Sequence, residues 1–240
     1  MSELPALRRV GHKGADHIAP GNTAASFDAA LAAGVDMIEF DVLPEDMRRP
    51  ADSRLMLAHD YSHDLGTALT LGEGLAHLAS SRFTDVELDV DLKLPGYEAR
   101  VVEALRAHGL VERTLVSTTF MRSLVAVRTL EPRLRLGWSV PRARRDYTAS
   151  WSTKLYAYAA IGRIRRRLPE AAERHLAAGR CEAVMAHWRL VTDRLVRAVR
   201  EAGGELYVWT VDDAERIQRL ERQGVTGVIT NDPRLFVMHR

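Results

Sequence analysis

Carboxylates recur at alternate positions in two apolar runs of this chain. Glu39 and Asp41 lie two residues apart in the first run, and Asp89, Asp91 and Lys93 repeat that spacing in the second. A period of two places each set on one face of an extended strand. Such carboxylate oxygens favour Mg²⁺ or Ca²⁺, with Mn²⁺ as a further candidate, over zinc. We expect Glu39, Asp41 and Asp91 to form the cluster, with Asp89 as the substitute for Asp91.

Two histidines and two lysines supply the remaining chemistry. His12 and His59 each stand at the end of a strand-like run, and their ordinary pKa suits proton transfer near neutrality. Lys13 and Lys93 are two of only three lysines, against 31 arginines, and an ammonium group can face an anion. A metal, cations and two proton-transfer groups together suit displacement at phosphorus.

Strand-like and helix-like runs alternate, which indicates parallel βα units. About eight such units in 240 residues predict a TIM (β/α)8 barrel, in which the carboxyl ends of the strands form the site. Nine strand-like runs are present, one too many, and the excess suggests a hairpin or extension at the barrel mouth. The strand-like runs are 7–11, 37–42, 55–59, 86–92, 114–117, 134–139, 183–186, 206–211 and 227–230, and the helix-like runs include 23–33, 97–108, 122–130, 192–202 and 213–223.

The domain prediction is a single barrel over 1–240, with 141–180 inserted as a helical connection. We expect two helices in it, 152–161 and 163–178, broken near Gly162 and Pro169. Residues 141–175 carry nine basic and three acidic side chains. The connection is either a solvated cap or a lid that steers anionic substrates and makes a weak contact with an anionic membrane surface. The arginines that would carry this contact are Arg163, Arg165, Arg166 and Arg167.

Composition excludes several classes of protein. Hydrophobic residues make up 46% and charged residues 28%, as in ordinary globular domains, and the single cysteine excludes an intramolecular disulfide framework. No run approaches the roughly 20 apolar residues of a membrane span, and 1–9 lacks the apolar core of a signal peptide. The net charge of +2 argues neither for nor against a nucleic-acid partner. We expect a cytoplasmic protein with a small-molecule substrate and no nucleic-acid partner.

Read together, these motifs resemble the glycerophosphodiester phosphodiesterase family over nearly the whole chain. No single motif is specific, but their combination and order are. The family's H-R-G and P-E-N-T motifs are matched by His12-Lys13-Gly14 and Pro20-Gly21-Asn22-Thr23. Its H-D and E-I-K motifs are matched by His59-Asp60 and Asp91-Leu92-Lys93. Near the C-terminus, W-T-V-N is matched by Trp209-Thr210-Val211-Asp212, and G-V-D-G-I-I-T-D-x-P by the run from Gly224 through Thr230-Asn231-Asp232-Pro233.

The resemblance implies metal-dependent hydrolysis of glycerophosphodiesters to glycerol 3-phosphate and an alcohol. His12 and His59 would be the acid/base pair, Glu39, Asp41 and Asp91 the metal ligands, and Lys13 and Lys93 the cations beside the phosphate. The chain departs from the family pattern at Lys13 (arginine in the family), Gly21 (glutamate), Asp91 (glutamate) and in the longer loop 44–53.

Three alternatives stay open at this stage. Trp209 either closes the barrel core or walls the pocket for the alcohol. The substrate is either a small glycerophosphodiester or a lysophospholipid cleaved at its headgroup. The departures also allow a catalytically impaired barrel that binds phosphorylated ligands.

Overall fold

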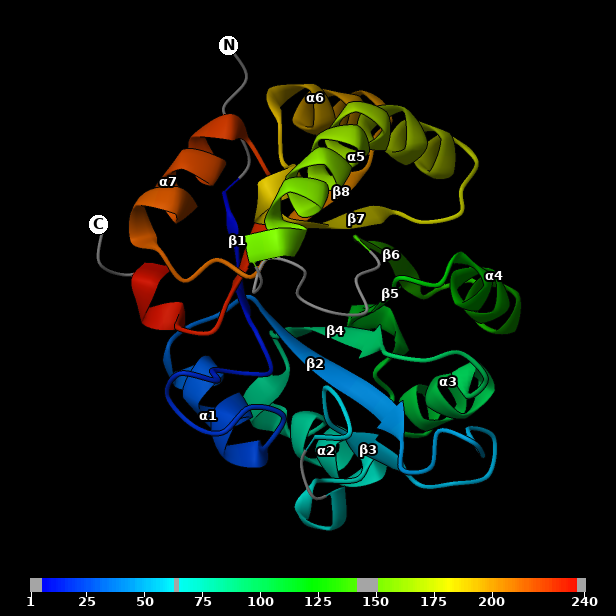
Figure 1. The fold of residues 1–240 in the computed structure, drawn as a ribbon. Helices are drawn as coiled ribbons and strands as arrows, with labels where there is room; N and C mark the ends of the chain where they lie inside the picture. The colour runs from blue at the N-terminus through cyan, green and yellow to red at the C-terminus, as the bar shows by residue number, and fades with distance from the viewer. Residues whose placement is uncertain (1–5, 63–64, 142–150, 237–240) are drawn as a thin grey trace.

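Eight parallel strands form a closed barrel in the computed structural model (Figure 1). The structure describes residues 6–62, 65–141 and 151–236, and for 151–160 it describes the backbone alone. The barrel closes because β1 pairs with both β2 and β9. The predicted TIM barrel is confirmed. Its strands are β1 (Arg8–Gly11), β2 (Met37–Pro44), β4 (Glu87–Leu92), β5 (Thr114–Thr118), β6 (Arg135–Val140), β7 (Ala183–His187), β8 (Glu205–Trp209) and β9 (Gly227–Thr230).

The excess strand is β3 (Leu55–Leu57), which pairs antiparallel with β2 as a hairpin at the mouth. Val42 lies opposite Leu57 in this pairing. The strand was expected to run to His59 but ends two residues earlier, so His59 lies in the loop that follows. The hairpin is an insertion before the helix at Leu71–Leu78, which makes the crossover from β2 to the next barrel strand, β4.

Seven α-helices in the described part of the chain surround the barrel. Most begin at a side-chain cap: Thr23 accepts the backbone N–H of Ser26, and Asp213 accepts that of Arg216. Gly224 ends the last helix in the left-handed region at φ 81°, where glycine costs least. The helices are α1 (Ala24–Ala32), α2 (Leu71–Leu78), α3 (Glu98–Ala107), α4 (Met121–Leu130), α5 (Trp151–Ala177), α6 (Asp193–Glu201) and α7 (Ala214–Gln223).

The prediction of two helices in the 141–180 connection was wrong. A single helix, α5, runs through both Gly162 and Pro169. Leu168, Ala172 and Leu176 are buried in the core, so tertiary packing offsets the hydrogen bond that proline removes. The start of the connection, 142–150, lies outside the described residues.

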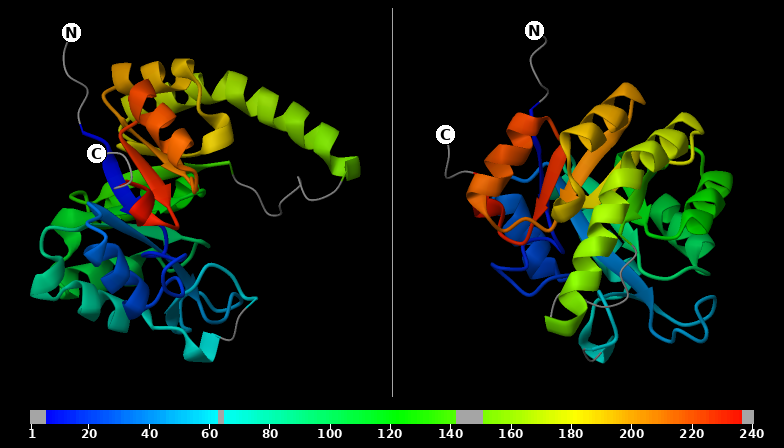
Figure 2. Two further views of the ribbon diagram at one scale, coloured as in Figure 1. Left: turned by 90° about the vertical axis from the view of Figure 1, so that its left-hand side faces the viewer. Right: turned by 45° about the horizontal axis from the view of Figure 1, so that its top comes forward.

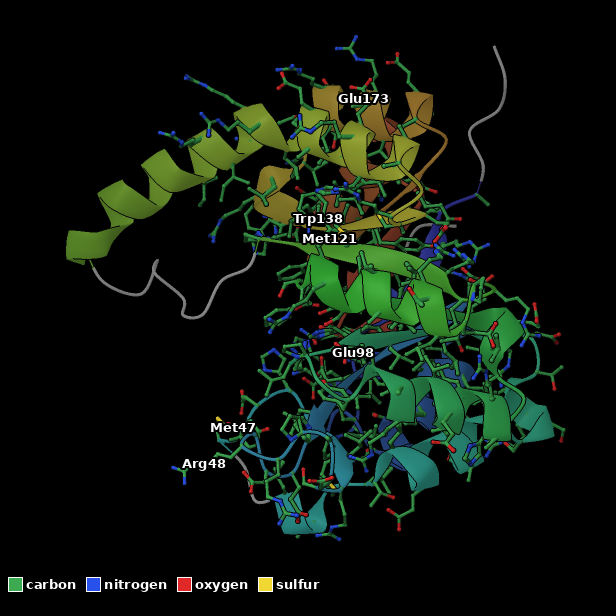
Figure 3. All side chains as sticks on the ribbon, turned by 90° about the vertical axis from the view of Figure 1, so that its right-hand side faces the viewer. Met47, Arg48, Glu98, Met121, Trp138 and Glu173 are labelled. Atoms are coloured by element: carbon green, nitrogen blue, oxygen red, sulfur yellow. The ribbon has the colours of Figure 1, made fainter. Side chains whose placement is uncertain are left out.

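The mouth of the barrel is bordered by α5 and by the loop between β2 and β3. The N-terminal half of α5 extends well beyond the barrel (Figure 2). Met47 and Arg48, in the loop, project on the same side of the molecule (Figure 3). Both segments follow the carboxyl end of a strand, the end at which sites form in this fold. No helix in the described ranges combines the length and apolarity needed to cross a bilayer.

Alternation along the strands divides the barrel interior into three levels. Along β2, Met37, Glu39 and Asp41 face inward, while Ile38 and Phe40 pack under the surrounding helices. The middle level is apolar and lies between a charged level at the strand starts and a carboxylate level at the strand ends. Its buried members are Val10, Met37, Leu115, Ala183, Met185, Tyr207 and Ile229.

The charged level at the strand starts is an ion-pair cluster. Glu87 on β4 accepts from Arg8 on β1 and from Nη1 of Arg135 on β6 at 2.8 Å. Arg135 also pairs with Glu205 on β8. Burial alone would raise the pKa of Glu87, but hydrogen bonds from both arginines outweigh it and lower that pKa. The cluster links β1, β4, β6 and β8 at the end of the barrel where the strands begin.

Replacing Glu87 by glutamine should destabilise the fold by about 1 to 3 kcal/mol at neutral pH, since two arginines would lose a shared carboxylate. A lowered carboxyl pKa stabilises the protein above the ordinary glutamate value of about 4.3. The advantage of the wild type is then lost as pH falls through the lower folded pKa. Urea unfolding of the wild type, E87Q and the surface control E103Q from pH 7 to pH 3 measures this. A difference that is independent of pH would contradict the assignment.

Candidate active site

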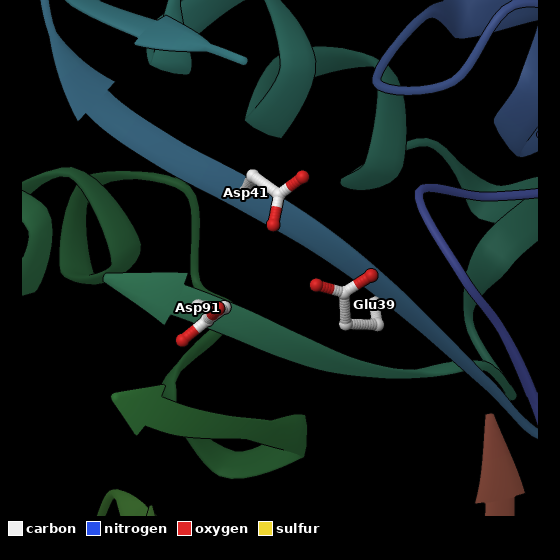
Figure 4. A group of neighbouring side chains, drawn as sticks. All are labelled: Glu39, Asp41 and Asp91. Carbon is white, nitrogen blue, oxygen red and sulfur yellow. The ribbon is translucent and has the colours of Figure 1, made fainter. Parts of the chain in front are cut away.

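Three carboxylates from two neighbouring strands meet inside the mouth of the barrel. Glu39 and Asp41 come from β2 and Asp91 from β4, and Figure 4 shows their side chains directed into the same space. One oxygen from each lies within 4.8 Å of the others. The register makes this possible, because Asp41 lies directly opposite Asp91 across the strand pair. The structure therefore brings together the three predicted metal ligands.

Lys93 neutralises part of this cluster. Its Nζ lies 2.5 Å from Asp41 Oδ1 and 2.5 Å from Asp91 Oδ2. Burial alone would lower the pKa of Lys93, but Asp41, Asp91 and Glu39 raise it well above the ordinary value. Burial and the charge of Asp41 raise the pKa of Glu39. One ammonium among several buried carboxylates leaves a site short of positive charge.

Asp89 lies one inward position before Asp91 and outside the three-carboxylate group. It is 1% exposed, and burial together with the charge of Asp91 raises its pKa to about 8. Its carboxylate oxygens are not among the three ligand atoms that lie within 4.8 Å of one another. The geometry therefore favours Asp91 over Asp89 as the third member of the cluster.

The loop after β1 folds back onto the cluster. Lys13 adopts φ 51°, in the left-handed region, and its backbone N–H donates to Glu39 Oε2 at 2.9 Å. Asn22, at φ 60°, donates from Nδ2 to Asp41 Oδ2 and accepts the backbone N–H of Asp41, both at 3.0 Å. Two strained residues thus fix the orientation of two carboxylates, a use of strain that is common at functional sites.

His12 lies beside the cluster at the end of β1. Its Nε2 is 3.8 Å from Glu39 Oε2, and its Nδ1 is 2.5 Å from Asn231 Oδ1. Burial lowers the pKa of His12, although Asp41 and Asn231 oppose the shift. A histidine that is neutral at physiological pH can accept a proton. Asn231 lies in a motif recognised in the sequence, but its contact with His12 had not been expected.

His59 occupies a more open position. It is about half exposed, and its Nδ1 lies 3.1 Å from Asp60 Oδ2. Its charge lowers the pKa of Asp41, which places it within electrostatic range of the cluster. The two predicted proton-transfer groups therefore differ in setting, one in the barrel wall and the other in the loop after β3.

The side chain of Lys13 turns away from the carboxylates toward Asp16. Lys13 Nζ lies 3.3 Å from Asp16 Oδ2, while Asp16 Oδ1 accepts the backbone N–H of Gly21 at 2.8 Å. A Cβ at position 21 would lie 2.6 Å from Asp16 Oδ1. The absence of a side chain at Gly21 therefore leaves room for the carboxylate of Asp16. Sequence reasoning missed Asp16, because its role depends on this gap.

Trp209 lies between the apolar core of the barrel and its mouth. Its Nε1 donates to the backbone carbonyl of Met185 at 2.9 Å, and its ring packs on the apolar level of the barrel. It also meets the ring of His187 edge to face at 5.2 Å and remains partly exposed. Trp209 closes the top of the core, and its role in binding the alcohol stays a prediction.

Comparison with known proteins identifies the chain. The model of the glycerophosphoryl diester phosphodiesterase family matches residues 12–101 and 89–235. The chain belongs to this family. The predicted resemblance and the predicted class of reaction, hydrolysis of a phosphodiester, are confirmed.

The relatives of this phosphodiesterase that follow match nearly all of the chain. A glycerophosphodiester phosphodiesterase of Caldanaerobacter subterraneus subsp. tengcongensis is 24% identical over 95% of both chains. The glycerophosphodiester phosphodiesterase structure from Parabacteroides distasonis aligns with a TM-score of 0.71 at 15% identity, covering 98% of this chain and 100% of that one. An Oleispira antarctica phosphodiesterase, solved with the product sn-glycerol-3-phosphate, aligns at 0.67 and 21% identity over 95% and 94%.

The carboxylates of this phosphodiesterase suit a divalent cation. Glu39 and Asp41 are almost fully buried, and all the converging ligand atoms are oxygens, as hard cations require. A bound cation would supply the positive charge that Lys93 provides only in part. The residues thus fit the predicted metal site, and they do not distinguish Mg²⁺, Ca²⁺ and Mn²⁺.

Replacing Asp41 by asparagine should remove the thermal stabilisation that a divalent cation gives. Binding to the folded state alone stabilises it by about 2.7 kcal/mol at a hundredfold excess over Kd. We expect Mg²⁺, Ca²⁺ or Mn²⁺ to raise the Tm of the wild type and not that of D41N, as measured by calorimetry.

Two variants control this experiment. Asp28→Asn removes a half-exposed carboxylate that pairs with Arg82 on the outer surface, and it should respond to metal like the wild type. Asp91→Glu keeps a ligand and should retain the shift. An undiminished shift in D41N would remove Asp41 from the ligand set.

Proposed function

We propose that this phosphodiesterase hydrolyses small glycerophosphodiesters to glycerol 3-phosphate and an alcohol, using a divalent cation held by Glu39, Asp41 and Asp91. The observation that carries the proposal is the convergence of these carboxylates, within 4.8 Å, beside a partly buried histidine, His12. The product named for the Oleispira antarctica relative is consistent with this chemistry. Mg²⁺ or Ca²⁺ is the preferred ion, with Mn²⁺ as a further candidate.

The two histidines divide proton transfer between them in this proposal. His12, neutral and partly buried, accepts the proton of the attacking hydroxyl at Nε2. His59, exposed and supported by Asp60, donates a proton to the leaving alcohol oxygen. The bond between phosphorus and that oxygen breaks as the new phosphorus–oxygen bond forms. A cation held by the three carboxylates would draw charge from the phosphoryl oxygens.

Lys93 and Lys13 provide positive charge near the phosphate. Lys93 reaches the substrate from its place between Asp41 and Asp91. Lys13 does so from the rim, where Asp16 holds its ammonium group. Trp209 borders the pocket for the alcohol.

The attacking hydroxyl belongs either to water or to the substrate. A cyclic phosphate detected by phosphorus NMR would identify the second route.

A substrate panel tests the function directly. Purified protein is incubated with glycerophosphocholine, glycerophosphoethanolamine and a lysophospholipid, each with Mg²⁺, Ca²⁺, Mn²⁺ or chelator. We expect metal-dependent release of glycerol 3-phosphate from the first two. Release of lysophosphatidate alone would favour the lysophospholipid alternative, and no release at all would favour a barrel that only binds phosphorylated ligands.

Replacing either histidine by alanine should reduce turnover by about 10² to 10⁴, the usual contribution of a positioned proton-transfer group. The metal-induced Tm shift should be largely kept in H12A and H59A, because neither histidine is a proposed ligand. Steady-state kinetics and calorimetry on the same preparations separate the two effects. Near wild-type turnover in one variant would show that its histidine has another role.

The broader predictions belong to the same proposal. Arg163, Arg165, Arg166 and Arg167 are exposed on α5, the helix that extends beyond the barrel (Figure 2). Their contact with an anionic membrane surface stays a prediction, and flotation with anionic and neutral liposomes tests it. The single domain over 1–240 and the cytoplasmic location also stay predictions.

A further inference from the structure

Asp212 makes three hydrogen bonds to the segment that contacts His12. Asp212 follows β8, and the segment, Thr230 and Asn231, lies at the end of β9. Asp212 Oδ1 accepts the backbone N–H of Asn231 at 2.8 Å and the hydroxyl of Thr230 at 3.0 Å. Asp212 Oδ2 accepts Nδ2–H of Asn231 at 2.7 Å. One carboxylate therefore holds both the backbone and the side chain of Asn231.

These contacts determine which end of the Asn231 amide faces His12. A carboxylate only accepts hydrogen bonds, so the NH₂ group of Asn231 must face Asp212. The amide oxygen then faces His12 Nδ1, at 2.5 Å. Because an amide oxygen, like a carboxylate, only accepts hydrogen bonds, the His12 ring must donate one from Nδ1 to Asn231 Oδ1. The unprotonated Nε2 is left on the side of the carboxylate cluster, 3.8 Å from Glu39.

We propose that Asp212 is a positioning residue that acts through Asn231 to hold His12 in the tautomer with its proton on Nδ1. The effect of this tautomer on kcat rests on the proposed function, in which Nε2 of His12 accepts the proton. Asp212 itself touches neither His12 nor the carboxylates in any contact recorded for the described residues.

The family motifs support a coupled role for these two positions. Where the family pattern W-T-V-N ends in asparagine, this chain has Asp212, and where the pattern T-D-x-P has aspartate, it has Asn231. The carboxylate and the amide have exchanged places, so the pair keeps one charge and one amide. In this chain a neutral amide oxygen faces His12, and the carboxylate of Asp212 bonds the NH₂ group at the other end of that amide.

The first experiment replaces Asp212 by asparagine. The new amide offers either oxygen or NH₂ to Asn231, so the orientation of Asn231 is no longer determined. We expect kcat to fall about 10- to 100-fold, as for other outer partners of site histidines, with KM changed less than about threefold. The matched control is Asp213→Asn, which alters the adjacent carboxylate that caps α7 at Arg216 and should keep kcat.

The second experiment tests the coupling. N231D alone places two carboxylates within hydrogen-bonding distance, and it should lower both kcat and Tm. The double variant D212N/N231D restores a donor facing an acceptor and should recover kcat to within about threefold of the wild type. A double variant no better than D212N would overturn the proposal, as would an unchanged kcat in D212N.

A spectroscopic readout separates this proposal from the proposed function. Nitrogen-15 NMR of the histidine rings in metal-free protein should show Nδ1–H for His12 in the wild type and a mixture of tautomers in D212N. Nδ1–H alone in both proteins would overturn the role of Asp212, whatever the kinetics. A protein without phosphodiesterase activity that still shows this tautomer change would refute the proposed function and leave the positioning role intact.

Discussion

The accumulation of negative charge inside a closed barrel is the constraint on which the site depends. Glu39, Asp41, Asp89 and Asp91 project inward from two adjacent strands, where water cannot solvate them freely. The negative charge is reduced by different means at different positions. Lys93 pairs with two of the carboxylates, and burial favours the protonated form of Asp89 and raises the pKa of Glu39. In the proposed function, a divalent cation would complete the compensation.

The remainder of the barrel is arranged around this charged level. A layer of apolar side chains, including Met37 and Tyr207, separates the carboxylates from the ion pairs at the strand starts. In that lower cluster Arg8 and Arg135 balance Glu87 and Glu205, so its charges are paired within the protein. The upper cluster is left with an excess of acid. Stability is thus concentrated at one end of the strands and reactivity at the other.

Much of the site could be predicted from the sequence because the period of a strand is two. That period placed Glu39 and Asp41 on one face, and the strand order brought Asp91 beside them. Side-chain direction could not be read in the same way. Lys93 pairs with carboxylates and Lys13 with Asp16, since long flexible chains take the nearest opposite charge.

Contacts between distant segments explain most of what sequence reasoning missed. Asp212 and Asn231 stand 19 positions apart and meet only because β8 and β9 are neighbours. The continuity of α5 through Pro169 depends on packing against the core, which helix propensity does not include. The capping box of Thr70 and Glu73 marks the start of α2 in the sequence, but Gly72 and Gly74 weaken its helical pattern.

The hairpin formed by β3 has a consequence for how the site can move. β3 is the only strand in the described ranges outside the closed ring, and three residues of pairing attach it to β2. His59 is carried by the loop beyond this short attachment, whereas His12 is bonded through its backbone to Thr230 in the ring itself. A displacement of the hairpin therefore alters the spacing of the two histidines while the carboxylates stay in register. One of the two histidines is thus held by an appendage of the barrel, and the other by the ring that also holds the carboxylates.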